Sequence, residues 1–146
     1  NIDGYILLNY NEKSKITEIK INIKNLTPGK HGFHIHKYGD LRGSCESLCE
    51  HFNPFNKKHG NINTNNSHNG DLGNIIANRN GICKYTIKTN KLKLKGKHSI
   101  IGRSIVIHED EDDLGLGGHN LSLKTGNSGK RIACGVIGYA NTNIKD

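Results

Sequence analysis

Seven side chains that can bind a metal ion occur at spacings that would let them act together: His34, His36, His51, His59, His68, Asp71 and His108. His34 and His36 are two residues apart in a run that alternates apolar and polar residues. On a β-strand both side chains would project from the same face, so the two imidazoles could chelate one ion. A pair of this kind standing alone is more often two surface histidines, but here five further ligand-type residues accompany it.

The downstream ligand-type residues predict a second ion. His51, His59, His68 and Asp71 are spaced so that one loop could offer three imidazoles and a carboxylate, a ligand set typical of tetrahedral Zn²⁺. Ligation by several imidazoles also suits Cu²⁺. His108 ends an apolar run and could complete the ligands of the other ion. Seven ligands fit two ions that share one imidazole, which requires a ring deprotonated at both nitrogens. We therefore predict a two-metal site.

The elements that must position these residues are predicted to be β-strands. Apolar and polar residues alternate, with many β-branched side chains, at 4–8, 19–23, 32–36, 85–87 and 104–108, and turn signals lie at 27–29, 69–71, 78–81 and 126–129. The alternation at 91–95 is also typical of the solvated face of a strand. No segment predicts an amphipathic helix of three turns. We expect an all-β sandwich or barrel, with long loops near 37–83 and 108–130 that carry most of the histidines.

Length and composition limit the classes of protein. The 146 residues predict a single domain over 1–146, and a hydrophobic content of 33% predicts a small core rich in Ile, Leu and Val. No apolar run reaches the length of a membrane span, and residues 1–10 do not have the order of a signal peptide. The net charge of +8 invites a nucleic-acid partner, but many lysines alternate with apolar residues, so we expect neither nucleic-acid nor membrane binding. Four scattered cysteines allow at most one structural disulfide.

Six segments, taken together, resemble the copper–zinc superoxide dismutase family in order and spacing over nearly the whole chain. They are residues 32–36 (GFHIH), 51–54 (HFNP), 58–60 (KHG), 68–74 (HNGDLGN), 101–109 (IGRSIVIHE) and 131–138 (RIACGVIG).

The resemblance implies a role for each ligand. His34, His36 and His108 match the family's copper-only histidines, and His51 matches the histidine that bridges copper and zinc. The remaining zinc ligands match His59, His68 and Asp71. The implied reaction is the disproportionation of superoxide to dioxygen and hydrogen peroxide by redox cycling of copper. Zinc is structural in this scheme because its filled d shell has no accessible redox step.

The resemblance also implies residues that support the metals. Arg131 matches the arginine that binds the incoming anion, and His51 would carry a proton during the cycle. Asp112 matches the carboxylate that orients one copper and one zinc histidine. Cys45 and Cys134 match the family's disulfide, although Cys49 could compete for Cys134. Cys83 is expected to be a free thiol rather than a ligand.

The implied fold is an eight-stranded Greek-key barrel with long zinc-binding and electrostatic loops. The chain opens at a point that matches the end of the family's first strand or its first hairpin, which implies that this strand is missing. Asp110 and Glu111 add negative charge where better-known members often carry a lysine, and Asn120 and Leu121 occupy a usually acidic pair. Lys124 and Thr125 match the family's residues at the lip of the substrate channel. We therefore expect less electrostatic steering of superoxide than in a typical member.

Several further properties are implied by the resemblance. A homodimer is expected through residues that match the family's dimer patch: Tyr38, Gly39, Ile101, Gly102, Val136, Gly138 and Tyr139. A copper chaperone is a candidate partner, and the cytosol is the expected location. One alternative is a copper-binding or copper-chaperone-like module without turnover, but such relatives usually lack a copper ligand or the arginine. The other is a structural zinc protein or zinc hydrolase, which leaves four of the ligand-type residues unexplained.

Overall fold

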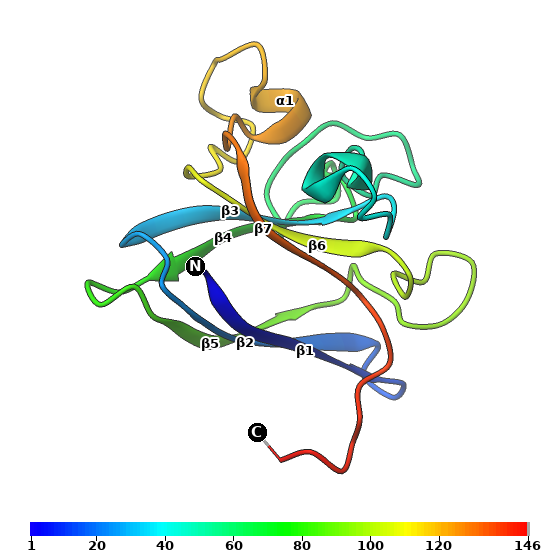
Figure 1. Cartoon of the computed structure of the whole chain (residues 1–146). Helices are drawn as coiled ribbons and strands as arrows, with labels where there is room; N and C mark the ends of the chain where they lie inside the picture. The colour runs from blue at the N-terminus through cyan, green and yellow to red at the C-terminus, as the bar shows by residue number, and fades with distance from the viewer. Residues whose placement is uncertain (146) are drawn as a thin grey trace.

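The chain forms two antiparallel β-sheets that face each other (Figure 1), as a computed structural model describes it for residues 1–145. One sheet has the order β1 (Asp3–Asn11), β2 (Ile16–Lys24), β5 (Cys83–Thr89). The other has the order β4 (Asp71–Ala77), β3 (Gly29–His36), β6 (Ser104–His108), β7 (Arg131–Val136). Two short helical segments, η1 (Ser44–Leu48) and α1 (Ser122–Thr125), lie in the loops. The predicted all-β class is confirmed.

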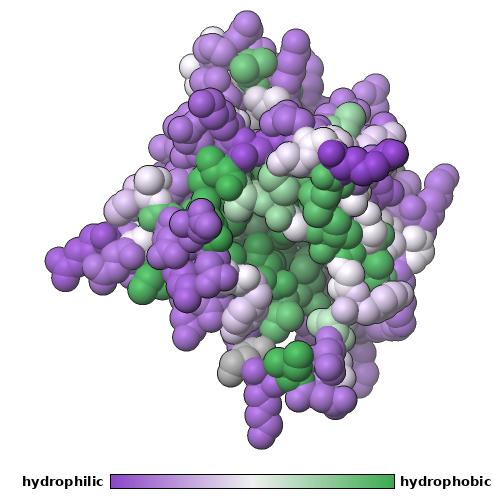
Figure 2. Space-filling model, in the orientation of Figure 1, coloured by the Kyte–Doolittle hydropathy of each residue, from purple (hydrophilic) through white to green (hydrophobic). Residues whose placement is uncertain are grey.

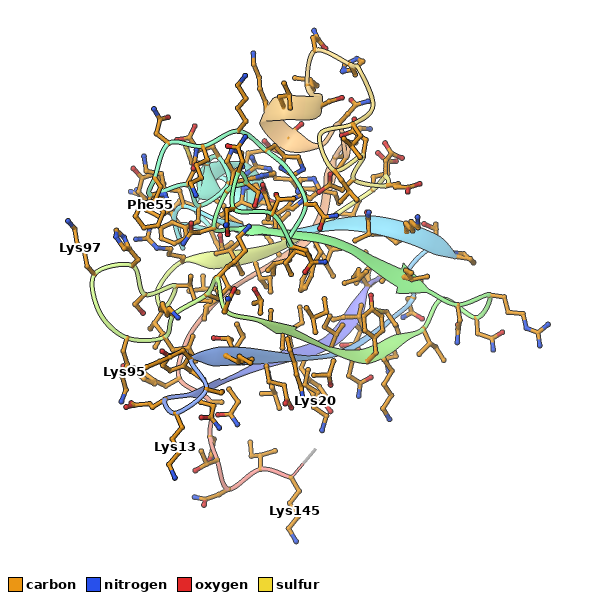
Figure 3. The ribbon with its side chains drawn as sticks, turned by 180° about the vertical axis from the view of Figure 1, so that it is seen from behind. Lys13, Lys20, Phe55, Lys95, Lys97 and Lys145 are labelled. Carbon is orange, nitrogen blue, oxygen red and sulfur yellow. A yellow bond between two sulfur atoms is a disulfide. The ribbon has the colours of Figure 1, made fainter. Side chains whose placement is uncertain are left out.

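The core lies between the sheets and follows from the alternation in the strands. On β2 the side chains of Ile19, Ile21 and Ile23 are buried, and on β3 those of Phe33 and Ile35 are buried. Each such side chain, moved fully out of water, contributes about 1.5–3 kcal/mol. Polar residues on the opposite face of β2 remain at least partly accessible to solvent. The lysines labelled in Figure 3 project outward from the edges of the molecule.

Two expectations about local structure were wrong. The predicted loop 37–83 contains β4, whose Gly73 and Asn74 interrupt the apolar alternation and hide the strand from pattern reading. The alternating segment 91–95 is not a strand among the described residues, where it makes only an isolated bridge between Lys93 and Ser99. Leu92 is nevertheless fully buried, because this irregular segment packs into the core.

Two long connections rise above the four-stranded sheet on the side away from the core (Figure 1). The first, over 37–70, is tied to β7 by a disulfide between Cys45 and Cys134, as the resemblance implied. The second, over 109–130, is tied to β4 by backbone-to-side-chain hydrogen bonds between Asn74 and Asp112. Cys49 is a free, exposed thiol.

Within residues 1–145 no helix is long and apolar enough to cross a membrane.

Candidate metal centre

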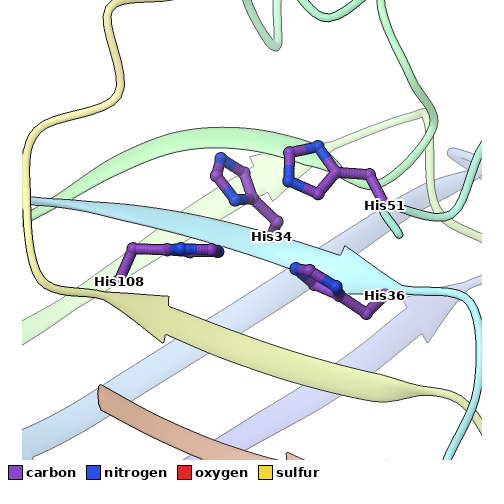
Figure 4. Close-up of side chains that lie close together, drawn as sticks. All are labelled: His34, His36, His51 and His108. Atoms are coloured by element: carbon purple, nitrogen blue, oxygen red, sulfur yellow. The ribbon is translucent and has the colours of Figure 1, made fainter. Parts of the chain in front are cut away.

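Three of the histidines are placed by neighbouring strands of one sheet. His34 and His36 lie on β3, which pairs with β6 in the register His34 to Val106 and His36 to Ser104. His108 is the last residue of β6, and His51 reaches the site through an isolated bridge with His36. The four rings converge on one point (Figure 4), and their ligand nitrogens lie within 4.8 Å of one another. His34 and His36 therefore turn their rings toward the same point, as expected of two residues on one face of a strand.

This first group contains a set of buried nitrogens without partners. Among the described residues, the unpartnered buried side-chain atoms are His34 Nδ1, His36 Nε2, His51 Nε2 and His108 Nε2. Leaving a buried polar atom unsatisfied costs about 1–3 kcal/mol, so four such atoms around one point indicate a site that binds an ion. Nitrogen lone pairs from four imidazoles are the donor set that copper prefers. The residues present therefore fit a copper ion.

The other nitrogen is held in place in three of these rings, those of His34, His36 and His108. His36 Nδ1 donates to the Cys49 carbonyl at 2.8 Å, and His108 Nδ1 donates to the Gly129 carbonyl at 3.2 Å. His34 Nε2 lies 2.7 Å from Asp112 Oδ2. Because one nitrogen of each ring is used in this way, the opposite nitrogen presents its lone pair to the centre.

Burial keeps these rings uncharged. Desolvation is the main reason that the pKa of His36 falls to about 2, and it also lowers the pKa values of His34, His51 and His108. The positive charge of Arg131 lowers the pKa of His36 and of His108 further. At neutral pH the four rings are therefore neutral, which is the form that binds a metal.

A second group surrounds a carboxylate. Asp71 Oδ1 lies 3.0 Å from His51 Nδ1, 2.9 Å from His59 Nδ1 and 3.2 Å from His68 Nδ1. The other oxygen, Asp71 Oδ2, accepts hydrogen bonds from the backbone N–H groups of Gly60 and His68. Three imidazoles and one oriented carboxylate fit the tetrahedral ligand set of Zn²⁺.

Among the described residues, His51 is the one that belongs to both of these groups. Its Nδ1 points to the Asp71 group, while its Nε2 is one of the unpartnered atoms of the first group. The ring centroids of His34 and His51 are 4.1 Å apart. This is the geometry expected of an imidazole shared by two ions.

The Asp112 carboxylate links the two groups by contacting one histidine of each. Its two carboxylate oxygens each lie 2.7 Å from a histidine, Oδ2 from His34 Nε2 and Oδ1 from His59 Nε2. Burial disfavours the charged form of His59, but hydrogen bonds to Asp112 and Asp71 outweigh it and raise the pKa of His59 to about 9. Burial likewise opposes ionisation of Asp71, yet its hydrogen bonds to three histidines lower its pKa. In the metal-free protein, protonated His59 therefore donates its Nδ1–H to Asp71 and its Nε2–H to Asp112.

Arg131 is fixed beside the first group by backbone carbonyls. Its Nη1 donates to the Cys45 carbonyl at 2.8 Å and its Nη2 donates to the Cys49 carbonyl at 2.6 Å. The Cys45–Cys134 disulfide joins the same two segments, the loop with η1 and the strand β7. A guanidinium anchored in this way presents a fixed positive charge to a small anion.

Three supporting groups were not found from the sequence. His31, which is buried, lies 2.8 Å from the His108 carbonyl through Nδ1 and 2.7 Å from the Thr27 carbonyl through Nε2, so it ties the β6 ligand to the turn before β3. The carbonyls of Cys49 and Gly129 orient two ligand rings. Backbone carbonyls leave no mark in a sequence. The sequence contains nine histidines, and this high number was the one signal that could have drawn attention to His31.

Comparisons with known proteins agree with this geometry. Residues 2–137 match the family model described as copper/zinc superoxide dismutase (SODC). A superoxide dismutase [Cu-Zn] of Paramecium bursaria Chlorella virus 1 is 54% identical over 134 residues, which are 91% of this chain and 72% of that protein. An extracellular superoxide dismutase [Cu-Zn] of Onchocerca volvulus is 48% identical over 142 residues, covering 95% of this chain and 71% of that protein. The crystal structure of the clock protein EA4 superposes with a TM-score of 0.91 at 44% identity, covering 94% of this chain and 87% of that one. With this match over most of its length, the chain belongs to the copper/zinc superoxide dismutase family.

Proposed function

We propose that this protein disproportionates superoxide to dioxygen and hydrogen peroxide at the paired centre. Copper would be held by His34, His36, His51 and His108. Zinc would be held by the other ligand set, which consists of His51, His59, His68 and Asp71. The observation that carries the proposal is the convergence of four buried, unpartnered imidazole nitrogens, one of them on a ring shared with a second metal-binding group.

Copper bound in the first group supplies one-electron oxidation and reduction, whereas zinc supplies charge and structural order. Binding of the anion and handling of a proton would be carried out by side chains of the protein. Arg131, with its fixed guanidinium, binds and orients the small anion. His51 Nε2 faces the centre without another partner, and the family resemblance implies that this nitrogen would hold one of the protons that peroxide needs. Asp71 holds the opposite nitrogen of the same ring.

Metal content measured together with superoxide loss tests this function. Metal-free protein loaded with copper and zinc should bind one of each and remove superoxide. An Arg131→Gln variant should keep both metals and lose roughly tenfold or more in rate, because a charge-assisted hydrogen bond contributes about 1.5–3 kcal/mol. Arg42→Gln is the matched control, since Arg42 is exposed and pairs with Asp40. Full metal loading without superoxide loss would instead support a copper-binding module without turnover, and zinc alone would support a zinc protein.

Steering of superoxide is proposed to be weaker than in typical members of the family. Asp110 and Glu111 are exposed in the loop that directly follows His108, and Glu111 forms an ion pair with Lys30 at 3.0 Å. Negative charge on this loop opposes the approach of an anion. We expect an Asp110→Lys variant to be faster at low salt and to lose more of its rate as ionic strength rises. A wild-type rate that falls as steeply as that of the variant would contradict this part of the proposal.

Assembly and location are further proposals. Exposed apolar side chains in the proposed dimer patch, Tyr38, Val136 and Tyr139, support a homodimer. Sedimentation of the wild type beside a Val136→Asp variant tests the homodimer.

We also propose that the protein is cytosolic and is loaded by a copper chaperone. Cell fractionation, and copper content in cells with and without such a chaperone, test these two points.

A further inference from the structure

Hollows in the surface of the molecule differ in the chemistry of their lining. One, of about 650 Å³, opens between β1 and β7 and is lined mainly by apolar side chains (Figure 2). Another, of about 450 Å³, lies between the turn that joins β1 to β2, the end of β5 and residues 62–65 of the first connection. We call it the polar groove, because its lining includes Asn63, Thr64, Asn65, Asn90 and two lysines, Lys88 and Lys91. Within residues 1–145 no carboxylate lines it.

Two lysines approach the loop that forms one wall of the polar groove. Lys91, which is partly buried, donates through Nζ to the hydroxyl of the buried Ser67. Lys57 donates through Nζ to the backbone carbonyl of Asn65. Both acceptors are uncharged oxygens, so neither contact neutralises the charge of an ammonium group.

The surroundings of Lys91 disfavour its positive charge. Burial lowers the pKa of Lys91, and the positive charge of Lys57 lowers it further, although the carboxylate of Asp71 raises it. An anion in the polar groove would oppose the first two effects, since a nearby opposite charge favours the protonated amine. Lys88 is already paired, because its Nζ lies 3.9 Å from Glu18 Oε2. Lys91 and Lys57 are therefore the two cations that an anion in the groove would neutralise.

We propose that the polar groove binds a phosphate group, either as free phosphate or on a small phosphorylated metabolite, with Lys91 as its charged partner and Lys57 adding positive charge. A phosphate ester carries a charge of about −1.5 to −2 at pH 7 and so matches two ammonium groups, whereas a carboxylate carries a single charge. Its oxygens are acceptors, and the hydroxyl of Ser14 and the side-chain amides of Asn63 and Asn90 are donors on the same lining. A hollow of about 450 Å³ also leaves room for the remainder of a small metabolite.

Acetylation of individual lysines, followed by mass spectrometry, tests this proposal on the metal-loaded full chain. The probes are inorganic phosphate and glucose 6-phosphate, each compared with sodium chloride at the same ionic strength. We expect saturating phosphate groups to slow acetylation of Lys91 and Lys57 by about fivefold or more, because a bound dianion favours the protonated, unreactive amine. Lys84, which is exposed on β5 outside the groove, should react at an unchanged rate.

The concentrations required identify the source of the phosphate group. Protection at a lower concentration of glucose 6-phosphate than of phosphate would support a phosphorylated metabolite, and protection at equal concentrations would support free phosphate. Because the readout is at lysines, it also separates this groove from the anion site at Arg131, whatever the outcome for superoxide.

Charge-matched variants make the result specific. In Lys91→Gln the protection of Lys57 should be lost, whereas Lys84→Gln should keep the protection of both lysines. Lys57→Gln is the second variant if Lys91→Gln fails to fold, and it should weaken the protection of Lys91. Unchanged rates at Lys91 with both probes, protection that chloride reproduces or that extends equally to Lys84, or protection of Lys57 that survives in Lys91→Gln would overturn the proposal.

Discussion

Cys49 has backbone angles of φ 67° and ψ −148°, which lie in a region populated almost only by glycine. It is held there by its surroundings, since its carbonyl accepts hydrogen bonds from both His36 Nδ1 and Arg131 Nη2. The conformation of this one residue thus orients a ligand of the first metal group and the anion-binding arginine together. A non-glycine residue in this region costs about 1–3 kcal/mol.

Replacing Cys49 with glycine should therefore stabilise the protein. Relief of about 1–3 kcal/mol of strain is offset by about 0.5–1 kcal/mol, because glycine gains more freedom in the unfolded chain. The thiol is exposed, so little packing is lost. We expect a net gain of about 0.5–2 kcal/mol relative to Cys49→Ala, or very roughly 2–8 °C in Tm for a chain of this size.

Alanine is the matched control because it also lacks the thiol but keeps the Cβ atom. Urea unfolding of both metal-free variants, with the disulfide intact, gives the difference directly. Equal stability of the glycine and alanine variants, or a less stable glycine variant, would refute the assignment of strain to this position. The superoxide dismutase activity of the metal-loaded glycine variant should match that of the wild type if the carbonyl keeps its place.

Three further predictions concern the supports of the site. Asp112→Asn should weaken metal binding by about 10–100-fold, because the carboxylate orients one histidine of each group, and competition with a chelator measures this. Cys134→Ser should lower the free energy of unfolding by about 4–5 kcal/mol, since the disulfide closes a loop with a sequence separation of 89; denaturant titration beside the wild type checks it. In metal-free protein the folded-state pKa of His36, about 2, is below the unfolded value of 6.5, so its contribution to stability is complete above pH 6.5 and is lost as pH falls. Between pH 7 and pH 5, the free energy of unfolding should therefore fall less steeply for metal-free His36→Leu than for the metal-free wild type. The two slopes should differ by up to ~1.4 kcal/mol per pH unit, as denaturant titration at each pH would measure.

Much of the fold and of the site could be predicted from the sequence because both rest on local rules. A period of two places side chains on one face of a strand, so the alternation around His34 and His36 predicted a chelating pair as well as a strand. The same rule missed β4, where Asn74 pairs with Gly32 of β3 and Gly73 lies at an irregularity in the register. It also wrongly predicted a strand at 91–95, where Leu92 is buried and Leu94 partly buried without a strand ladder. In both cases tertiary contacts outweighed the local pattern.

The sequence by itself determined which residues can bind metals and, through spacing and family resemblance, how they divide into two sets. Only the tertiary structure decided how they are held. Asp71 is centred among three rings, Asp112 joins one of these, His59, to His34, and the Cys49 carbonyl joins His36 to Arg131. These contacts link residues up to 82 positions apart or use backbone atoms common to every residue. Their geometry depends on how the loops pack on the sheet, and no local pattern encodes it.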